Sequence, residues 1–350
     1  MADYPLQPAA RDRFVLEQRP PRTALDPWRS QGLLLENELD RHGRTVRSAT
    51  VFLTGRECPW RCLMCDLWQH TTTADTPPGA IAAQTADARA TLRSLGEPIA
   101  QMKLYNAGSF FDPLAVPTGD YPAIASELAG LDRVIVESHP RLVDDRTALF
   151  IDALHTTGTG DPAPALEVAI GLETAHPVAL ERLNKRMTIA DFRAAASRLR
   201  AMGADLRVFL LVSPPFVPER EQDEWLMRSV DTAIDNGATV VSLIPTRTGN
   251  GALDAVARSG DFHGPSLTDL ERSLALGLRG ARETRRRVRI FADTWNLDRF
   301  AHGPDCLESH LSRLHAMNAS QAALPEYPCP HCTRISDGAL GAPSNAGARA

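Results

Sequence analysis

The chain has 350 residues, a hydrophobic content of 43% and a formal net charge of −5 at pH 7. This length supports one large domain, or one domain with small appendages. The acidic balance argues against a strong general affinity for nucleic acid. No apolar run approaches the roughly 18 residues that span a bilayer, so we expect no membrane partner. The N-terminus lacks the apolar core of a signal peptide, so we expect a cytoplasmic protein.

Short β-prone runs alternate with amphipathic helical stretches along most of the chain, which is the pattern of βα units around a parallel sheet. Because these runs are continuously apolar, we expect a sheet that is buried on both faces. The predicted strands cover residues 50–53, 101–105, 133–138, 166–171, 206–212, 238–244 and 287–292. Six or seven units predict an α/β fold, a partial (β/α)6-type TIM barrel, one or two units short of a complete one.

This barrel accounts for residues 48–300. Residues 1–47 are rich in Pro and Arg and weakly periodic, so we expect an irregular N-terminal arm that lies on the barrel. Residues 301–335 contain three cysteines and several histidines, which predicts a small C-terminal Cys-rich metal module. Residues 336–350 cannot bury enough apolar surface to become ordered, so we expect a disordered tail.

One predicted helix has a recognisable start. Residues 266–278 are expected to form a helix, and Thr268 precedes Glu271 by three residues. A hydroxyl three residues before a carboxylate is the signature of a capping box. The sequence therefore predicts that Thr268 and Glu271 cap the start of this helix.

Three of the six cysteines lie in "GRECPWRCLMCDLW", directly after the first predicted strand, with the spacing Cys58-x-x-x-Cys62-x-x-Cys65. Loops that leave the carboxyl ends of barrel strands carry the chemistry. A four-iron cubane normally takes four thiolates, so three thiolates leave one iron free to bind a substrate or cofactor. We therefore interpret these cysteines as ligands of a [4Fe-4S] cluster. The alternatives are a zinc site completed by Asp66 or His70, and thiols that bind no metal.

The cysteine loop resembles that of the radical SAM superfamily, whose members carry C-x-x-x-C-x-x-C after the first strand of a partial barrel. Other segments resemble the branch that contains the elongator catalytic subunit, coproporphyrinogen oxidase and methylthiotransferase enzymes. These are "YNAGSFFDPLAVP", "VESHPRLV", "LEVAIGLETAHPVALERLNKRMT" and "FLLVSPPFVPE". Within that branch the chain is most similar to the radical SAM subunit of archaeosine synthase and uncharacterised bacterial relatives. Met64 departs from the pattern, because many members place an aromatic residue there.

The resemblance implies that the open iron chelates S-adenosylmethionine (SAM) and that one electron cleaves it to a 5′-deoxyadenosyl radical, which abstracts hydrogen from a substrate. It also implies a reductant of the flavodoxin or ferredoxin type. The residues at the strand ends that match plausible SAM contacts are Asn106, Gly108, Ser109, Glu137, Ser138, Glu173, Ser213 and Ile244.

The other three cysteines, Cys306, Cys329 and Cys332, follow the last predicted strand. A C-x-x-C pair with a third cysteine and nearby histidines suits a Cys3His zinc site, and it suits an auxiliary iron–sulfur cluster equally well. The sequence leaves these two possibilities open. The candidate histidines are His302, His310, His315 and His331.

We therefore expect a radical SAM enzyme, for which two kinds of substrate are open. The similarity to archaeosine synthase indicates a modified tRNA base and hence tRNA modification. The acidic net charge instead favours a small molecule or a natural-product intermediate. The rival from another class is a non-catalytic iron–sulfur or zinc protein that uses the barrel as a binding platform.

Overall fold

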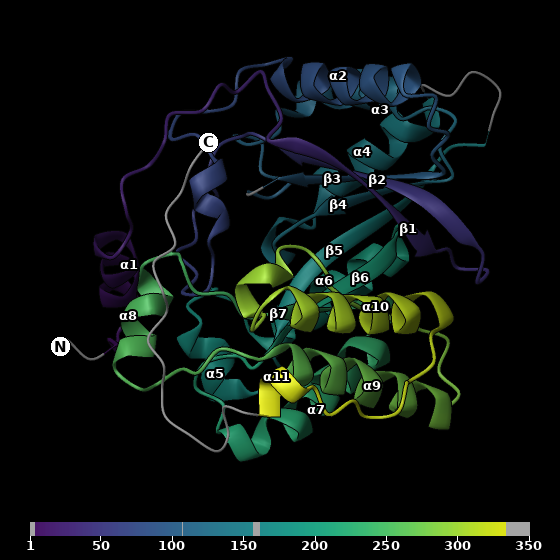
Figure 1. Cartoon of the computed structure of the whole chain (residues 1–350). Helices are drawn as coiled ribbons and strands as arrows, with labels where there is room; N and C mark the ends of the chain where they lie inside the picture. The colour runs from purple at the N-terminus through teal and green to yellow at the C-terminus, as the bar shows by residue number, and fades with distance from the viewer. Residues whose placement is uncertain (1–3, 107, 157–161, 334–350) are drawn as a thin grey trace.

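The computed structural model describes residues 4–106, 108–156 and 162–333. Over these residues, eight strands form one curled sheet in the order β1 to β8 (Figure 1). β1 and β2 are antiparallel, and every later pair of neighbours is parallel. The strands are β1 (Gly32–Leu39), β2 (Thr45–Leu53), β3 (Gln101–Asn106), β4 (Arg133–Glu137), β5 (Ala165–Glu173), β6 (Asp205–Val212), β7 (Ala238–Pro245) and β8 (Arg289–Ala292). The predicted partial barrel is confirmed.

Eleven helices are present in the described residues, and most of those between the parallel strands pack their apolar sides against the sheet in one large core. They are α1 (Pro8–Glu17), α2 (Ala80–Ser94), α3 (Tyr121–Glu127), α4 (Asp145–Thr156), α5 (Pro177–Arg182), α6 (Ile189–Ala201), α7 (Gln222–Asp235), α8 (Ala252–Arg258), α9 (Leu267–Glu283), α10 (Pro304–Ser320) and α11 (Pro330–Thr333). Short 3-10 turns cover Leu67–His70, Thr118–Asp120, Pro140–Leu142, Glu219–Glu221 and Leu297–Phe300. Within the described ranges, no helix combines the length and apolar character that a membrane span requires.

Six predicted strands agree with the observed ones to within two residues at either end, because each is a short, mostly buried run in which apolar residues are frequent. The first strand begins at Thr45, five residues earlier than predicted. Its polar start pairs with β1, which the sequence pattern did not reveal. The predicted tail at 336–350 lies outside the described residues.

The expectation of an irregular N-terminal arm is wrong in part, because residues 1–47 contain helix α1 and strand β1. Only short apolar stretches of this region are buried, so its periodicity is weak. Phe14 and Val15 of α1 pack with Leu253 and Val256 of α8 in a small apolar cluster. β1 pairs along its whole length with β2.

The predicted capping box at Thr268 and Glu271 is also wrong. Ser266 is the N-cap of α9, and its hydroxyl accepts a hydrogen bond from the Asp269 backbone N–H at 3.1 Å. The Asp269 carboxylate accepts in return from the Ser266 N–H at 2.9 Å. The same type of motif occurs two residues earlier, which leaves the buried Glu271 free for the contact with His310 described below.

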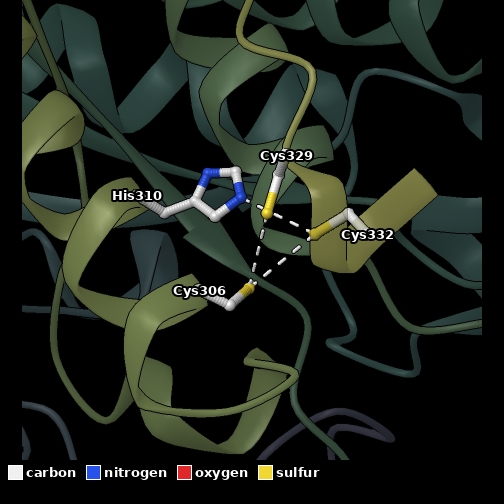
Figure 2. Close-up of side chains that lie close together, drawn as sticks. All are labelled: Cys306, His310, Cys329 and Cys332. Carbon is white, nitrogen blue, oxygen red and sulfur yellow. Dashed lines mark hydrogen bonds between the residues drawn. The ribbon is translucent and has the colours of Figure 1, made fainter. Parts of the chain in front are cut away.

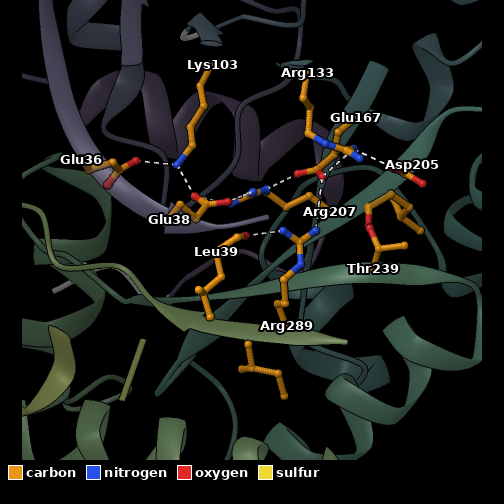
Figure 3. A network of polar contacts seen from close by, with 12 residues as sticks. Glu36, Glu38, Leu39, Lys103, Arg133, Glu167, Asp205, Arg207, Thr239 and Arg289 are labelled. Carbon is orange, nitrogen blue, oxygen red and sulfur yellow. Dashed lines mark hydrogen bonds and ion pairs between the residues drawn. The ribbon is translucent and has the colours of Figure 1, made fainter. Parts of the chain in front are cut away.

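A network of buried charges crosses the inside of the barrel near the amino ends of the parallel strands (Figure 3). Glu167 on β5 is fully buried and accepts from Arg207 Nε at 2.6 Å and from Arg133 Nη1 at 3.1 Å. Lys103 Nζ on β3 lies 2.5 Å from Glu38 Oε2 on β1. Four cations thus meet four carboxylates, which are Lys103, Arg133, Arg207 and Arg289 with Glu36, Glu38, Glu167 and Asp205.

The edge of β8 is covered by two side-chain amides from the end of α10. Asn318 Oδ1 accepts from the Ala292 N–H and Asn318 Nδ2 donates to the Ala292 carbonyl, both at 2.9 Å. Gln321 makes the same pair of bonds with Ile290, at 2.7 and 2.9 Å. These amides take the place of a neighbouring strand, so the open edge of the sheet is not exposed for pairing with another chain.

We expect Glu167→Gln to lower the free energy of unfolding by about 3–5 kcal/mol, because it leaves buried guanidinium groups without their carboxylate. The matched control is Asp205→Asn at the rim of the same network, where the carboxylate side chain is 33% exposed and the loss should be at most about 1 kcal/mol. Urea unfolding of the three proteins measures both values. Equal stability of Glu167→Gln and wild type would contradict the role of the network.

Candidate functional site

The first cysteine loop leaves the carboxyl end of β2, and its backbone is fixed by two buried asparagines. Asn184 Nδ2 donates to the Arg61 carbonyl at 2.7 Å. Asn250 Nδ2 donates to the Leu63 carbonyl, also at 2.7 Å. Asn184 follows α5 and Asn250 follows β7, so the cysteine loop is bound to two segments that are distant from it in the chain.

Two arginines of the N-terminal segment also bind the cysteine loop. Glu57, next to Cys58, accepts from Arg19 Nη1 at 2.9 Å and from Arg22 Nη2 at 2.5 Å. The Arg19 guanidinium also lies 4.6 Å from the ring centre of Trp68, which is a cation–π contact. The loop is therefore held at both ends of its cysteine motif.

The three thiols of this loop are partly buried. Burial raises the pKa of Cys62 to about 12; the neighbouring Lys185 opposes this rise and Cys58 adds to it. Burial and the two other cysteines raise the pKa of Cys65 still more strongly. The pocket by itself thus favours neutral thiols, and a bound cation would be needed to hold three thiolates.

The spacing of these sulfurs differs from that of a single-ion site. Among the described residues, the triplet Cys58, Cys62 and Cys65 does not form a group whose sulfurs all lie within 4.8 Å of one another. A cubane places each thiolate on a different iron, so it requires more widely separated sulfurs than one ion does. Three thiols on one loop match the three ligands that leave one iron of a cubane free, whereas a structural zinc ion needs a fourth ligand.

The predicted contact residues all lie at the edge of the sheet that carries the cysteine loop. Three of them end their strands, which are Asn106 on β3, Glu137 on β4 and Glu173 on β5. Ile244 is the last residue but one of β7. The others follow directly after strands, and they are Gly108, Ser109, Ser138 and Ser213. Parallel strands bring these positions to one rim.

Asn106 is the clearest unpaired group at this rim. Its side chain is buried, and neither its Nδ2 nor its Oδ1 has a hydrogen-bond partner in the part of the chain that the structure describes. Gly108 lies so close to the cysteine loop that a Cβ would come within 2.8 Å of the Arg56 carbonyl oxygen. Ser109 Oγ already accepts from the His139 N–H at 2.7 Å, so this hydroxyl joins the segment after β3 to the segment after β4.

Two rim residues hold an unusual backbone conformation. Glu173 has φ = 67° and Ser213 has φ = 54°, in the left-handed region that non-glycine residues seldom adopt. Such conformations cost on the order of 1–3 kcal/mol each and cluster at functional sites. The Glu173 carboxylate lies 2.5 Å from Lys185 Nζ, and a Cβ on Gly171 would collide with both groups. Glycine at 171 thus makes room for this ion pair.

Lys185 and His139 were not predicted from the sequence. The imidazole of His139 stacks on Trp60 of the cysteine loop, with ring centres 3.6 Å apart, and its Nε2 lies 2.9 Å from the Lys185 carbonyl oxygen. Burial lowers the pKa of His139 to about 3, so the ring is neutral and donates through Nε2. A lone histidine or lysine in a sequence gives no sign of such stacking or pairing, although both lie in segments that carry the family resemblance.

The second triplet converges with one histidine. Cys306 and His310 lie one turn apart on α10, while Cys329 and Cys332 come from the segment that ends in α11 (Figure 2). The ligand atoms of these four residues all lie within 4.8 Å of one another. Of the four candidate histidines, the structure brings His310 into this group; His302, His315 and His331 are not part of it in the described ranges.

The chain is similar to two curated proteins and to several solved structures. No family model matches the chain. It is 25% identical over 266 residues to archaeosine synthase subunit beta of Methanosarcina acetivorans, which covers 73% of this chain and 72% of that protein. It is 33% identical over 133 residues to archaeosine synthase subunit beta of Thermococcus kodakarensis, covering 37% and 39% respectively.

Among solved structures, coproporphyrinogen III oxidase from Escherichia coli, described as a radical SAM enzyme, aligns with a TM-score of 0.45 and 14% identity. That alignment covers 68% of this chain, and this chain spans only about half (52%) of the oxidase. The sequence similarities confirm the predicted resemblance to archaeosine synthase subunit beta. The prediction that the chain is an enzyme agrees with the names of these two relatives, which are subunits of a synthase.

Glu137 provides a test of the buried rim. Burial raises the pKa of Glu137 from 4.5 to about 8, and Glu173 adds to the rise while Lys185 opposes it. Between pH 4.5 and about pH 8, the Glu137 carboxyl is protonated in the folded chain and ionised in the unfolded chain. The free energy of unfolding of the wild type should therefore fall, relative to Glu137→Gln, by up to about 1.4 kcal/mol per pH unit as the pH rises toward 8, and the difference should then level off.

Urea unfolding of the protein without added cofactors, from about pH 5 to pH 9, measures this difference. Glu17→Gln is the control, because Glu17 is exposed and makes no contact of this kind in the described structure. If the stability of Glu137→Gln and wild type changed in parallel over the whole range, the carboxyl would not be held protonated by the fold.

Proposed function

We propose that the chain cleaves SAM reductively at a [4Fe-4S] cluster bound by Cys58, Cys62 and Cys65. The observation that supports this most directly is the position of the three thiols. They lie on the first βα loop of a parallel barrel, next to a rim that carries an unpaired buried amide and two residues in a strained backbone conformation. Three thiolates leave one iron of a cubane without a protein ligand.

The residues at the rim fit SAM as the ligand of that iron. The unpaired amide of Asn106 offers both a donor and an acceptor to a polar ligand. The Glu137 and Glu173 carboxyls offer acceptors for an ammonium group or a ribose hydroxyl. Gly108, Ser109, Ser138, Ser213 and Ile244 are proposed as further contacts. When bound, the reduced cluster supplies the electron that splits SAM into methionine and a 5′-deoxyadenosyl radical, which takes a hydrogen atom from the substrate.

The chain's own contribution is to position these groups and exclude water. Asn184 and Asn250 hold the loop backbone, and the Trp60–His139 stack covers one side of it. Leu63, between two of the cysteines, is fully buried. Excluding water from the radical in this way would limit its side reactions with solvent.

For the substrate we propose a modified tRNA base, because two relatives found by sequence are subunits of archaeosine synthase. Their name as subunits also supports a protein partner for this chain, in addition to a reductant of the flavodoxin or ferredoxin type. The second candidate is a small molecule or natural-product intermediate, which the net charge of −5 supports because RNA binding normally needs a basic surface.

We expect Cys62→Ala to abolish the formation of 5′-deoxyadenosine, because the cluster loses one of three ligands. The protein is reconstituted anaerobically with iron and sulfide, mixed with dithionite and SAM, and 5′-deoxyadenosine and methionine are quantified by chromatography. Wild type should bind about four irons at this loop and form both products. Met64→Leu is the matched control, since it alters the same loop but keeps all three thiols, and it should retain cleavage.

A colourless wild-type protein that is inert toward SAM would instead support the non-catalytic alternative. The two substrate classes are separated by adding bulk tRNA, intact or digested with ribonuclease. A faster release of 5′-deoxyadenosine with intact tRNA alone supports the tRNA base, and no response to either preparation contradicts it.

A further inference from the structure

We infer that Cys306, His310, Cys329 and Cys332 bind a single Zn2+ ion in a closed, tetrahedral Cys3His site. The sequence leaves zinc and an iron–sulfur cluster equally open here, and the arrangement of the ligand atoms distinguishes them. The inference is independent of the proposed function, because it concerns a different set of ligands.

The distances between the ligand atoms are those of a tetrahedron around one ion. Cys306 Sγ lies 3.8 Å from Cys332 Sγ and 3.9 Å from Cys329 Sγ. Cys332 Sγ lies 3.6 Å from His310 Nε2. With Zn–S bonds of about 2.3 Å and a Zn–N bond of about 2.0 Å, tetrahedral geometry predicts S–S edges of about 3.8 Å and S–N edges of about 3.5 Å.

An iron–sulfur cubane does not fit these distances, because its thiolates bind different irons and cannot approach so closely. The sulfurs are also much too far apart for disulfides, whose S–S bonds are about 2.05 Å long. Soft thiolates with one imidazole in a tetrahedron are a donor set that selects zinc. On binding, Zn2+ replaces the thiol protons, which pass to solvent.

The histidine is already oriented for coordination by a carboxylate behind it. His310 is fully buried, and its Nδ1 lies 2.7 Å from Glu271 Oε1 on α9. The other oxygen of Glu271 accepts from Arg313 Nε at 2.9 Å. A proton on Nδ1 therefore leaves the lone pair of Nε2 directed at the sulfurs. This is the carboxylate–histidine–zinc arrangement that orients metal ligands.

Four protein ligands leave no position for a substrate, so the site is structural. The site joins α10 to the segment that ends in α11. Through the contact of His310 with Glu271 it is also joined to α9. The same region covers the edge of β8 with Asn318 and Gln321. The zinc ion thus holds the C-terminal segment against the open side of the barrel, and no open auxiliary iron is available there.

Metal analysis of the purified full-length chain tests the inference. We expect one zinc per chain in the wild type and in a variant in which Cys58, Cys62 and Cys65 are all alanine. His310→Ala should lose the zinc, while the matched control His315→Ala, an exposed histidine on the same helix, should retain it. Protein loaded with Co2+ in place of zinc should show the intense visible absorption of a tetrahedral thiolate site.

A triple-alanine variant that still bound about four irons would overturn the inference, because the cluster would then occupy the second triplet. So would a wild type that holds neither zinc nor Co2+ in tetrahedral form. These outcomes do not depend on SAM cleavage, so they are distinguishable from failure of the proposed function.

Glu271→Gln gives a second test that does not rely on removing a ligand. The neutral amide makes the imidazole less basic, so affinity for Zn2+ should fall by about 10- to 100-fold, as measured by competition with a chromophoric chelator. Iron binding at the first triplet should be unchanged. An unaltered zinc affinity would show that Glu271 supports the fold alone and does not orient the ligand.

Discussion

The charge network around Glu167 is the constraint on which the rest of the barrel depends. It connects side chains from β1, β3, β4, β5, β6 and β8 inside the sheet, where isolated charges would be very costly. Because four cations meet four carboxylates, the network is satisfied only when these strands lie in one register. That register also decides which residues reach the opposite rim, where the cysteine loop lies.

The two ends of the barrel differ in a way that suits a catalytic fold. At the amino ends of the strands each charged side chain of the network lies in at least one ion pair. At the carboxyl ends, Asn106 is buried without a partner, Glu173 and Ser213 hold a costly backbone conformation, and the pKa of Glu137 is raised by burial. Such features persist only where the surrounding structure enforces them, and they gather at sites that bind a ligand.

The two cysteine triplets differ in the arrangement of their ligand groups. The first lies on a loop whose backbone is fixed by two asparagines and which supplies three thiols, and this suits a cluster with one free iron. The second gathers three sulfurs and an imidazole around one point and orients the imidazole from behind, which suits a closed ion site. One triplet is thus proposed for chemistry, and the other for the attachment of the C-terminal segment.

The sequence alone was sufficient for the barrel, the cysteine spacing and the rim positions, because apolar runs and short motifs are local features. Strand pairing of β1 was missed because a polar-edged strand at 32–39 carries a weak pattern. Glu271 was assigned to a helix cap because spacing cannot show which way a carboxylate points. His310 was one histidine among four until the fold placed it beside Cys332. These outcomes depend on contacts between residues distant in the chain, such as Glu271 and His310 or Asn184 and Arg61. Only tertiary packing determines such contacts, since they follow from the way whole elements bury their surfaces and satisfy their charges.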